Sequence, residues 1–544
     1  GQAGPSASRS RRTPKAEEMT TSRRPSGILS LTLAGAVGLA GALLLTGPAE
    51  PATAAGPSLQ SQIDAAAPGA TITVDGGSYE ERIVIDKPLT LIGRSSPVID
   101  GGEHGDVVTI TSGDVYFSGF TVKGTGHAVT REPAAIKLTA VTGVTLRWNR
   151  IQDSHFGIYL LDSHEVLIEH NAIDLGSKTP VERRGHGIYM WQSGHSAIRD
   201  NTVRNAADGI HLEFSHTNVI ADNKVTDSRY ALHFMYANEN KVLRNSFRQN
   251  LAGAVLMFSR ELIVKDNDVS ANRKGASGAG LLLKDVDNLF VEANRIERNK
   301  YGLTAEGTPQ SPGATAIFYR NLFALNDTGV GLMSNAPITF VENSMIENGV
   351  QVKALGGALA SGMLASHEPA KPSATPVSGA SAHEHAATTP TTPAAAGGAV
   401  TLPRAAMWSA GGRGNYWSDY RGYDANGDGV GDKPYRPEPA FVGELAKNES
   451  LRAFQFTLAQ QAIDTAAEMF PLYQYDAVIE DAAPLMRPAA ALSVTAEEGV
   501  DLSVLALSAA MLALSVLAVL ALRRPRWRPE PALGMAAQAA GGGR

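Results

Sequence analysis

Histidine and methionine recur at one interval in the middle of this chain of 544 residues. His211 and His233 are 22 residues apart, and Met235 and Met257 repeat that spacing. Glu213 follows the first histidine by two residues. Imidazole and thioether groups are ligands for soft and borderline metal ions, above all Cu(I). We therefore take these five residues as candidate ligands for transient copper binding.

A second group of polar residues has the spacing of a calcium loop. In the run DANGDGVGD, oxygen-bearing side chains stand at Asp424, Asn426, Asp428 and Asp432, with a glycine directly after Asp428. This matches half of a calcium-binding loop, but Tyr435 stands where the closing glutamate is usual. A structural Ca²⁺ site and an ordinary turn rich in Asp and Asn both fit the pattern.

Three charged side chains offer a different chemistry. Enzymes that cleave or epimerise uronate polymers need an acid and a base beside a cation that neutralises the substrate carboxylate. Glu213, Lys284 and Glu306 have the types for those roles. A polysaccharide lyase or epimerase is therefore one alternative to a metal carrier, and a structural carbohydrate-binding module is another. Methionine and tryptophan beside these residues favour a chain that is not an enzyme.

A column of asparagines indicates the elements that position these residues. Most gaps between its members are 22 residues, and the longer ones fit 22 plus a surface loop. The spacing predicts an all-β fold, a right-handed parallel β-helix with rungs of about 22 residues and an internal asparagine ladder. The column comprises Asn149, Asn171, Asn201, Asn223, Asn245, Asn267, Asn294, Asn321 and Asn343.

Alternation along each rung assigns the candidate ligands to one face. The first and third residues after each rung glycine are mostly aliphatic, so the second and fourth should face outward. Residues one turn apart should then stack about 5 Å apart. Tyr189, Trp191 and Met333 occupy further outward positions and extend the group into a surface patch. Exposed methionine and tryptophan are unusual in a solvated patch. A metal site explains them, and so does a covering segment that makes the face a second hydrophobic core.

Composition excludes several classes of site. The chain has no cysteine, which excludes disulfides, a cysteine nucleophile and thiolate metal sites. Its formal net charge of −6 gives no sign of a nucleic-acid partner.

Both ends of the chain carry membrane signals. Arg23 and Arg24 precede an apolar stretch over 28–45 and small residues near 55, the pattern of a secretory signal, with an uncleaved anchor as the alternative. Residues 502–522 contain no charge and are followed by arginines, which predicts a transmembrane helix with a cytoplasmic tail. The region between should lie outside the cytoplasmic membrane, in the periplasm or on the membrane's outer face.

These signals divide the chain into six parts. We expect an N-terminal extension and signal peptide (1–55), the β-helix (56–350), a disordered insertion rich in Ala, Pro and Thr (351–400), a C-terminal cap segment with a helix over 444–469 and the calcium-like loop (401–490), the transmembrane helix (502–522) and a cytoplasmic tail (523–544). Ser58 should cap a short helix that closes the first rung.

Several rungs resemble one known family. RGHGIYMWQS, ADGIHLEFS, RYALHFMYANENKV and GAVLMFSRELIVKDN are similar to rungs of the NosD family of nitrous oxide reductase maturation proteins, as is GNYWSDYRGYDANGDGVGDKPY. The resemblance covers about residues 58–488. It implies a periplasmic copper-binding β-helix that sits on an ABC transporter with ATPase and membrane subunits. It further implies a lipoprotein copper chaperone as donor and nitrous oxide reductase as recipient, with copper or sulfur as the cargo. The insertion and the C-terminal membrane helix depart from the family's simplest, soluble form.

Overall fold

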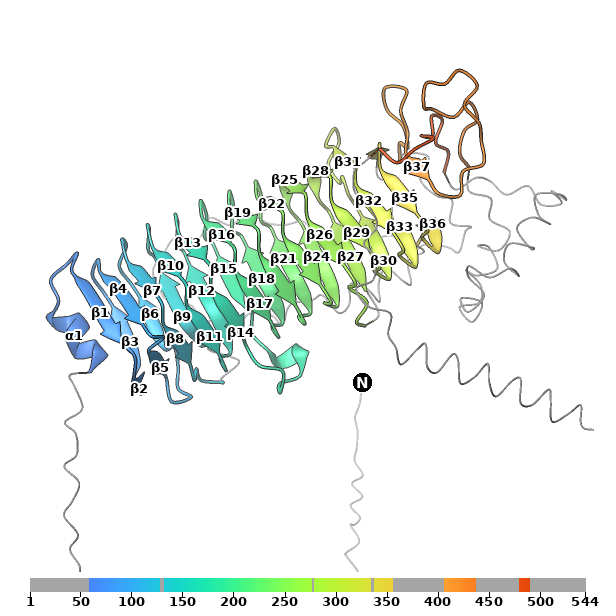
Figure 1. Ribbon diagram of the computed structural model, residues 1–544. Helices are drawn as coiled ribbons and strands as arrows, with labels where there is room; N and C mark the ends of the chain where they lie inside the picture. The colour runs from blue at the N-terminus through green and yellow to red at the C-terminus, as the bar shows by residue number, and fades with distance from the viewer. Residues whose placement is uncertain are drawn as a thin grey trace, which may run out of the picture. The chain divides into compact units, whose positions relative to one another are not determined.

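The chain winds into a stack of coils in which segments one turn apart lie side by side (Figure 1). The computed structural model describes residues 58–127, 132–275, 278–333, 337–355, 406–436 and 479–489. Each successive coil contributes one strand to each of three sheets, here called A, B and C, and neighbouring strands pair in parallel. This confirms the predicted parallel β-helix with an all-β core.

The strands are short and follow one another in the same order in every coil. Sheet A comprises β1 Thr71–Asp75, β4 Thr90–Arg94, β7 Tyr116–Ser118, β10 Thr145–Arg147, β13 Leu167–Glu169, β16 Ala197–Arg199, β19 Val219–Ala221, β22 Lys241–Leu243, β25 Arg260–Lys265, β28 Asp287–Glu292, β31 Ala316–Tyr319 and β34 Ile338–Val341. Sheet B comprises β2 Ser78–Tyr79, β5 Val98–Asp100, β8 Thr121–Lys123, β11 Arg150–Gln152, β14 Ala172–Asp174, β17 Thr202–Arg204, β20 Lys224–Thr226, β23 Ser246–Arg248, β26 Asp268–Ser270, β29 Arg295–Glu297, β32 Leu322–Ala324, β35 Ser344–Ile346 and β37 Tyr416–Trp417. Sheet C comprises β3 Ile83–Ile85, β6 Val108–Ile110, β9 Ala134–Thr139, β12 Phe156–Leu161, β15 Ile188–Trp191, β18 Asp208–Glu213, β21 Tyr230–Met235, β24 Ala252–Met257, β27 Ala279–Lys284, β30 Tyr301–Glu306, β33 Thr328–Leu332 and β36 Val350–Ala354.

The longer turns fall where the gaps in the asparagine column predict them. Extra residues separate β14 from β15, where a 3₁₀ turn forms at Val181–Arg183, and also separate β26 from β27 and β30 from β31. Because these residues leave the stack as loops, the strands on either side keep their register. The aliphatic residues that follow the rung glycines fill the interior, as predicted, and residues such as Ile210 and Leu232 are fully buried.

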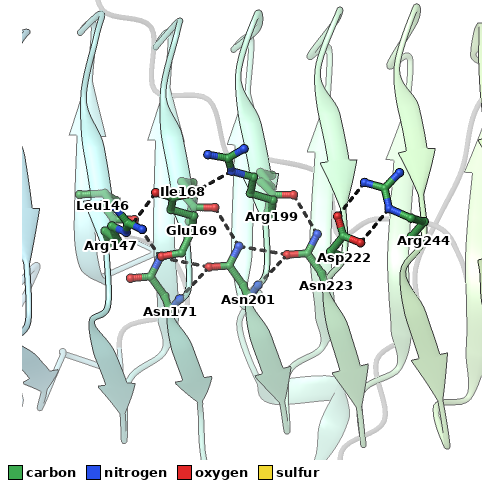
Figure 2. Close-up of polar contacts among 11 residues, drawn as sticks. Leu146, Arg147, Ile168, Glu169, Asn171, Arg199, Asn201, Asp222, Asn223 and Arg244 are labelled. Carbon is green, nitrogen blue, oxygen red and sulfur yellow. Dashed lines mark hydrogen bonds and ion pairs between the residues drawn. The ribbon is translucent and has the colours of Figure 1, made fainter.

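The asparagine column forms a continuous ladder inside the stack (Figure 2). Asn201 Nδ2 donates to Asn223 Oδ1 at 3.0 Å and to the Ile168 carbonyl at 2.9 Å. The backbone N–H of Asn201 donates to the same Asn223 oxygen at 3.0 Å. Each amide therefore satisfies buried backbone groups at a corner where the strands end. All nine predicted members are buried, with at most 2% of their surface exposed.

A second asparagine ladder runs beside the first and was not predicted. Asn250 Nδ2 donates to Asn272 Oδ1 at 3.2 Å, and Asn299 Nδ2 donates to Asn326 Oδ1 at 3.2 Å. Its members lie five residues after members of the first column and share their spacing, which was the signal available in the sequence. The ladder comprises Asn250, Asn272, Asn299, Asn326 and Asn348.

A short helix closes the N-terminal end of the core, as predicted. Helix α1 spans Leu59–Ala65, and the Ser58 hydroxyl accepts the Ser61 N–H at 3.1 Å. The Glu81 carboxylate accepts the Leu59 N–H at 2.6 Å. Leu59 and Ile63 are fully buried in the core cluster, so the helix covers apolar side chains that no earlier coil covers.

The C-terminal segments add a last partial coil. Asn343 Nδ2 donates to Asn415 Oδ1 at 2.8 Å, so the ladder continues across a long stretch of sequence. Asp481 then accepts the Asn415 N–H at 2.7 Å and the Trp417 indole N–H at 2.9 Å. The N–H groups of the ladder asparagines point toward the C-terminal end of the stack. The buried carboxylate of Asp481 accepts the last of them and so ends the ladder.

Several predicted segments lie outside the described residues. They are the signal peptide, residues 356–400 of the insertion, the helix over 444–469, the transmembrane helix over 502–522 and the tail. Within the described ranges, no helix has the length and apolar character needed to span a membrane. The membrane anchor therefore stays a prediction.

Candidate metal centre

The outer face of sheet C carries the histidines and methionines in straight columns. One column is Tyr189, His211, His233 and Val255, on β15, β18, β21 and β24. The parallel register pairs each residue with the next, one rung away. The His211 and His233 rings stack with centroids 4.3 Å apart, which confirms the stacking that the 22-residue spacing predicted.

The methionine column lies beside the histidine column. Trp191, Glu213, Met235 and Met257 occupy the next outward position of the same strands, in register with one another. The arrangement brings two imidazoles and two thioethers onto neighbouring rungs, about 4.8 Å apart.

The expectation that these side chains face solvent was wrong. The exposed fraction is 7% for His211, 4% for His233, 7% for Met235 and 5% for Met257. The physical reason is that large side chains stand in adjacent columns at rung spacing, so each is shielded by its neighbours. The burial fits the alternative interpretation, in which this face is a second core.

The face contains two apolar clusters, one on each side of the histidines. Tyr189 lies in a cluster with Phe156 and Tyr159, against which Trp191 packs. Met257 belongs to the other cluster, against which Met333 packs. The structure therefore separates the residues of the predicted surface patch, because Met333 lies three rungs beyond Met257 along the stack.

A buried carboxylate organises the polar centre between the two clusters. Asp208 is fully buried at the start of β18, and its Oδ2 lies 2.9 Å from His233 Nδ1 and 3.5 Å from His211 Nδ1. The Arg229 guanidinium donates to both carboxylate oxygens, at 2.9 and 3.0 Å. Burial alone would raise the pKa of Asp208, but Arg229 and the neighbouring histidines hold that pKa well below its usual range. Asp208 is therefore ionised and fixed by two hydrogen bonds from Arg229.

A third histidine completes the cluster. His186 Nδ1 accepts the backbone N–H of Asp208 at 3.3 Å, and its Nε2 lies 3.4 Å from His211 Nδ1. Among the described residues, His186, Asp208 and His211 are the group whose potential ligand atoms converge, all within 4.8 Å of one another. Burial lowers the pKa of His186 to about 4 and lowers that of His211 well below its ordinary value, so both imidazoles are neutral near pH 7.

Two imidazole nitrogens have no hydrogen-bond partner within the described part of the chain. They are His211 Nε2 and His233 Nε2, both buried. Because the ionised Asp208 carboxylate accepts the Nδ1–H of His233, the neutral form of this imidazole has its lone pair on Nε2. A carboxylate that orients an imidazole in this way is the usual second-sphere partner of a metal-bound histidine. The donor set therefore fits a soft or borderline metal ion, with Met235 on the same strand as His233.

Sequence reasoning missed Asp208, His186 and Arg229. Asp208 and His186 come directly before a rung glycine, and Arg229 lies at the corner before β21. The signal was a histidine or an aspartate in that position in RGHGI and ADGI, where most other rungs have alanine or an aromatic residue.

Glu213 is hydrogen-bonded to a residue of the aromatic cluster. Its Oε2 accepts the Tyr189 hydroxyl at 2.9 Å. Burial raises the pKa of Glu213, and the bond from Tyr189 opposes that shift. Glu213 therefore borders the histidine centre and ties it to the aromatic cluster.

The calcium-like loop is held by its own backbone. Asp424 accepts the N–H groups of Gly427 and Gly429 at 2.6 and 2.9 Å, and Asp432 accepts the Ala425 N–H at 2.7 Å. Tyr435 is buried, and its hydroxyl donates to Asp419, so it offers the loop no ligand. The carboxylates of Asp424, Asp428 and Asp432 do not converge as the histidine cluster does. Calcium binding by these residues and Asn426 stays a prediction.

Calcium binding predicts a chelator effect on stability. If the loop binds Ca²⁺, excess EGTA should lower the thermal midpoint, because a ligand present at 100 times its Kd stabilises a fold by about 2.7 kcal/mol. Asp428→Ala should remove that sensitivity, since Asp428 is exposed and contributes only bonds within the loop. An unchanged midpoint with EGTA in the wild-type protein would identify an ordinary turn.

Comparisons with known proteins agree on one family. A family model described as "Periplasmic copper-binding protein (NosD)" matches residues 173–361. The chain is 32% identical to a "Probable ABC transporter binding protein NosD" of Pseudomonas aeruginosa, over 76% of this chain and 88% of the relative. It is 31% identical to a protein of the same description from Stutzerimonas stutzeri, over 76% of this chain and 85% of the relative.

Solved structures with a similar architecture are more distant. The periplasmic alginate epimerase AlgG matches 53% of this chain and 77% of its own, at 15% identity and a TM-score of 0.38. The A-module of the Azotobacter vinelandii mannuronan C-5 epimerase AlgE4 matches 54% of this chain and 92% of its own, at 13% identity and a TM-score of 0.30.

Proposed function

This chain belongs to the NosD family, and we propose that it is an extracytoplasmic accessory protein that works with an ABC transporter to deliver copper for the copper centres of nitrous oxide reductase. The observation that carries the proposal is the pair of buried nitrogens, His211 Nε2 and His233 Nε2, without partners among the described residues. Two imidazoles beside two thioethers are donors that Cu(I) prefers.

The charges around the histidines favour copper over sulfur as the cargo. An anion such as sulfide would meet the ionised carboxylate of Asp208 beside His233. Arg229 does not compensate, because its guanidinium already bonds both oxygens of that carboxylate. A cation meets favourable interactions at the same place.

The proposed partners follow from the family. The transporter would contribute an ATPase and a membrane subunit, and a lipoprotein chaperone would supply the copper. The helix over 502–522 would hold the chain at the membrane, with the β-helix on the outer side. No feature of the described residues points to nucleic acid.

The alternative of a polysaccharide-acting enzyme has less support. Glu213 and Glu306 lie on β18 and β30, four rungs apart, which is about 19 Å. The two carboxylates therefore cannot flank one glycosidic bond, and Lys284 is already paired with Glu306 at 3.2 Å. A carrier needs no acid–base pair.

The test is a double substitution, His211→Asn with His233→Asn. We expect Cu(I) affinity of the purified protein to fall at least 100-fold, because both imidazole donors are lost, and nitrous oxide reductase to accumulate without its copper centres. Affinity is measured by competition with a chromophoric Cu(I) chelator, and the copper content of the reductase by elemental analysis.

The matched control is His195→Asn, which removes an exposed histidine from the turn between β15 and β16. It should leave both readouts unchanged. Normal copper content of the reductase with the double variant, in a protein that is folded, would refute the proposal.

A further inference from the structure

Four aromatic side chains form a strip on the surface along the edge of sheet C. The rings of Phe214 and Tyr236 stack with centroids 5.1 Å apart, and those of Tyr236 and Phe258 are also 5.1 Å apart. Trp191 packs edge to face against Phe214 at 5.4 Å. Phe214 and Tyr236 are 38% and 42% exposed. The four rings therefore form one contiguous apolar strip on successive coils, here called the aromatic ridge.

The backbone beneath the ridge is unfavourable for aromatic residues. Phe214, Tyr236 and Phe258 have φ angles of 48°, 52° and 52°, in the left-handed region that bulky side chains rarely adopt. Other coils carry small or polar residues at this position, namely Asp162, Gln192, Asp285 and Gly307. The fold therefore does not require rings here. Three coils in succession carry them at a cost in backbone strain and in exposed apolar surface, which is typical of a functional surface.

The ridge lies beside the proposed metal centre. Its last three members each come directly after a residue of the column formed by Glu213, Met235 and Met257. His211 and His233 occupy the outer face of the same strands, β18 and β21. A molecule bound to the ridge would therefore contact the coils that carry the two unpartnered imidazole nitrogens.

Carboxylates surround the ridge at the corners between sheets C and A. In six successive coils these corners comprise residues 162–165, 192–195, 214–217, 236–239, 258–261 and 285–288. They contain one guanidinium, that of Arg260, and six carboxylates, those of Asp162, Glu165, Glu239, Glu261, Asp285 and Asp287. A partner with positive charge around an apolar contact would complement this surface.

The same features disfavour other occupants. Both faces of the Tyr236 ring are covered by its neighbours, so the ridge offers ring edges, on which a sugar or a base cannot stack. An anionic membrane surface would meet like charge. Within this chain, residues 437–478 contain six acidic and two basic residues, and residues 356–405 contain two of each. A second copy has a net charge of −6. None of these supplies the positive charge that the corners call for.

We propose that the aromatic ridge is the docking surface for another protein, one with an apolar contact surface ringed by lysine or arginine, and that this protein exchanges copper with the histidine centre. The exchange of copper rests on the proposed function, whereas the docking rests on the ridge and on the charges around it. The carboxylates would steer the partner, and the ring edges would form the apolar centre of the interface.

The first test removes two rings of the ridge, with Phe214→Asn and Tyr236→Asn combined. The fold should tolerate the change, because asparagine adopts the left-handed conformation readily. We expect the Cu(I) affinity of the purified protein to stay within twofold of the wild type, since no imidazole or thioether is lost. The copper content of nitrous oxide reductase in cells should fall at least fivefold. Competition with a chromophoric chelator and elemental analysis give the two values.

Another corner of the β-helix supplies the matched control. Trp148→Asn with His170→Asn removes a second pair of stacked rings, 4.2 Å apart, from left-handed positions between sheets A and B. Trp148 is 56% exposed, so a similar apolar surface is lost. Both readouts should equal those of the wild type.

Photo-crosslinking identifies the occupant. p-Benzoylphenylalanine in place of Tyr236, in the full chain in cells, should cross-link to another protein at a segment where apolar residues stand beside lysine or arginine. Glu239→Lys with Glu261→Lys should lower the yield at least threefold, because like charges then face each other. The same photoreactive residue in place of Tyr423, an exposed tyrosine far along the chain, should not cross-link to that partner.

The outcomes separate docking from the proposed function. A cross-link confined to residues 356–405, to residues 437–478 or to a second copy overturns the proposal, since this chain itself then covers the ridge. Normal reductase copper in the Phe214→Asn, Tyr236→Asn variant also overturns it and leaves the histidine centre in place. If the wild-type protein binds no Cu(I) while the charge-dependent cross-link forms, the proposed copper site fails and the docking surface stands.

Discussion

Replacing Asp208 by alanine is expected to lower the free energy of unfolding by about 3 kcal/mol, because it leaves the Arg229 guanidinium largely buried without its counter-charge. Asp208 is fully buried and Arg229 is 29% exposed, so the loss should lie at the low end of the range for broken buried pairs. The measurement is urea denaturation of the metal-free protein.

The adjacent rungs contain a matched control for this variant. Asp222 and Arg244 form a pair of the same two-bond geometry, at 2.8 and 2.9 Å, on the exposed corner visible in Figure 2. Their side chains are 35% and 55% exposed, and such pairs contribute less than about 1 kcal/mol. Equal effects of Asp208→Ala and Asp222→Ala would contradict the burial argument.

A double variant separates charge from packing. Asp208→Ala with Arg229→Met should recover most of the lost stability, since no unpaired charge then remains. Copper affinity should not recover, because His233 Nδ1–H has lost the carboxylate that orients it, and such partners are worth roughly 10- to 100-fold in metal affinity. Recovery of both properties would assign Asp208 a purely structural role.

The repeat made the fold readable from the sequence. A buried asparagine such as Asn201 must form hydrogen bonds with the equivalent residues of the coils above and below. The spacing between these asparagines in the sequence therefore equals the length of one coil. The second ladder was missed because Asn250 and its successors begin only at the fifth coil of the column. The partial coil with Asn415 lies beyond a long insertion, where no regular spacing leads to it.

The site was predictable only in part, for a related reason. Register alone stacks His211 on His233, and that stacking was correct. Alternation assigns a side chain to a face of a strand, but it does not say what packs on that face, so the sequence left open whether Met235 is exposed or buried. Asp208 begins β18, and Arg229 lies at the corner before β21, so the two side chains meet across one rung. A single contact of this kind leaves no periodic signal in the sequence.

Asn223→Leu should be among the most destabilising single changes in the β-helix. Asn223 Oδ1 accepts both the backbone N–H and the side-chain amide of Asn201, each at 3.0 Å, and its Nδ2 donates to the Ile198 carbonyl at 2.8 Å. Leucine removes these partners where no water reaches, since Asn223 is fully buried. Asn201 Nδ2 keeps its bond to the Ile168 carbonyl, so two groups lose their partner, the Asn201 N–H and the Ile198 carbonyl. At about 1–3 kcal/mol for each buried unsatisfied group, we expect a loss of roughly 2–6 kcal/mol.

The neighbouring residue offers the control for this change. Lys224→Leu adds the same side chain at an exposed position of β20 and should stay within about 0.5 kcal/mol of the wild type. Urea denaturation gives the two free energies, and hydrogen exchange tests the mechanism. Exchange of the Asn201 amide should accelerate most in Asn223→Leu, because that N–H loses its only acceptor in the ladder. If instead exchange rises evenly along the stack, the loss of stability comes from the misfit of leucine at the corner and not from the broken ladder.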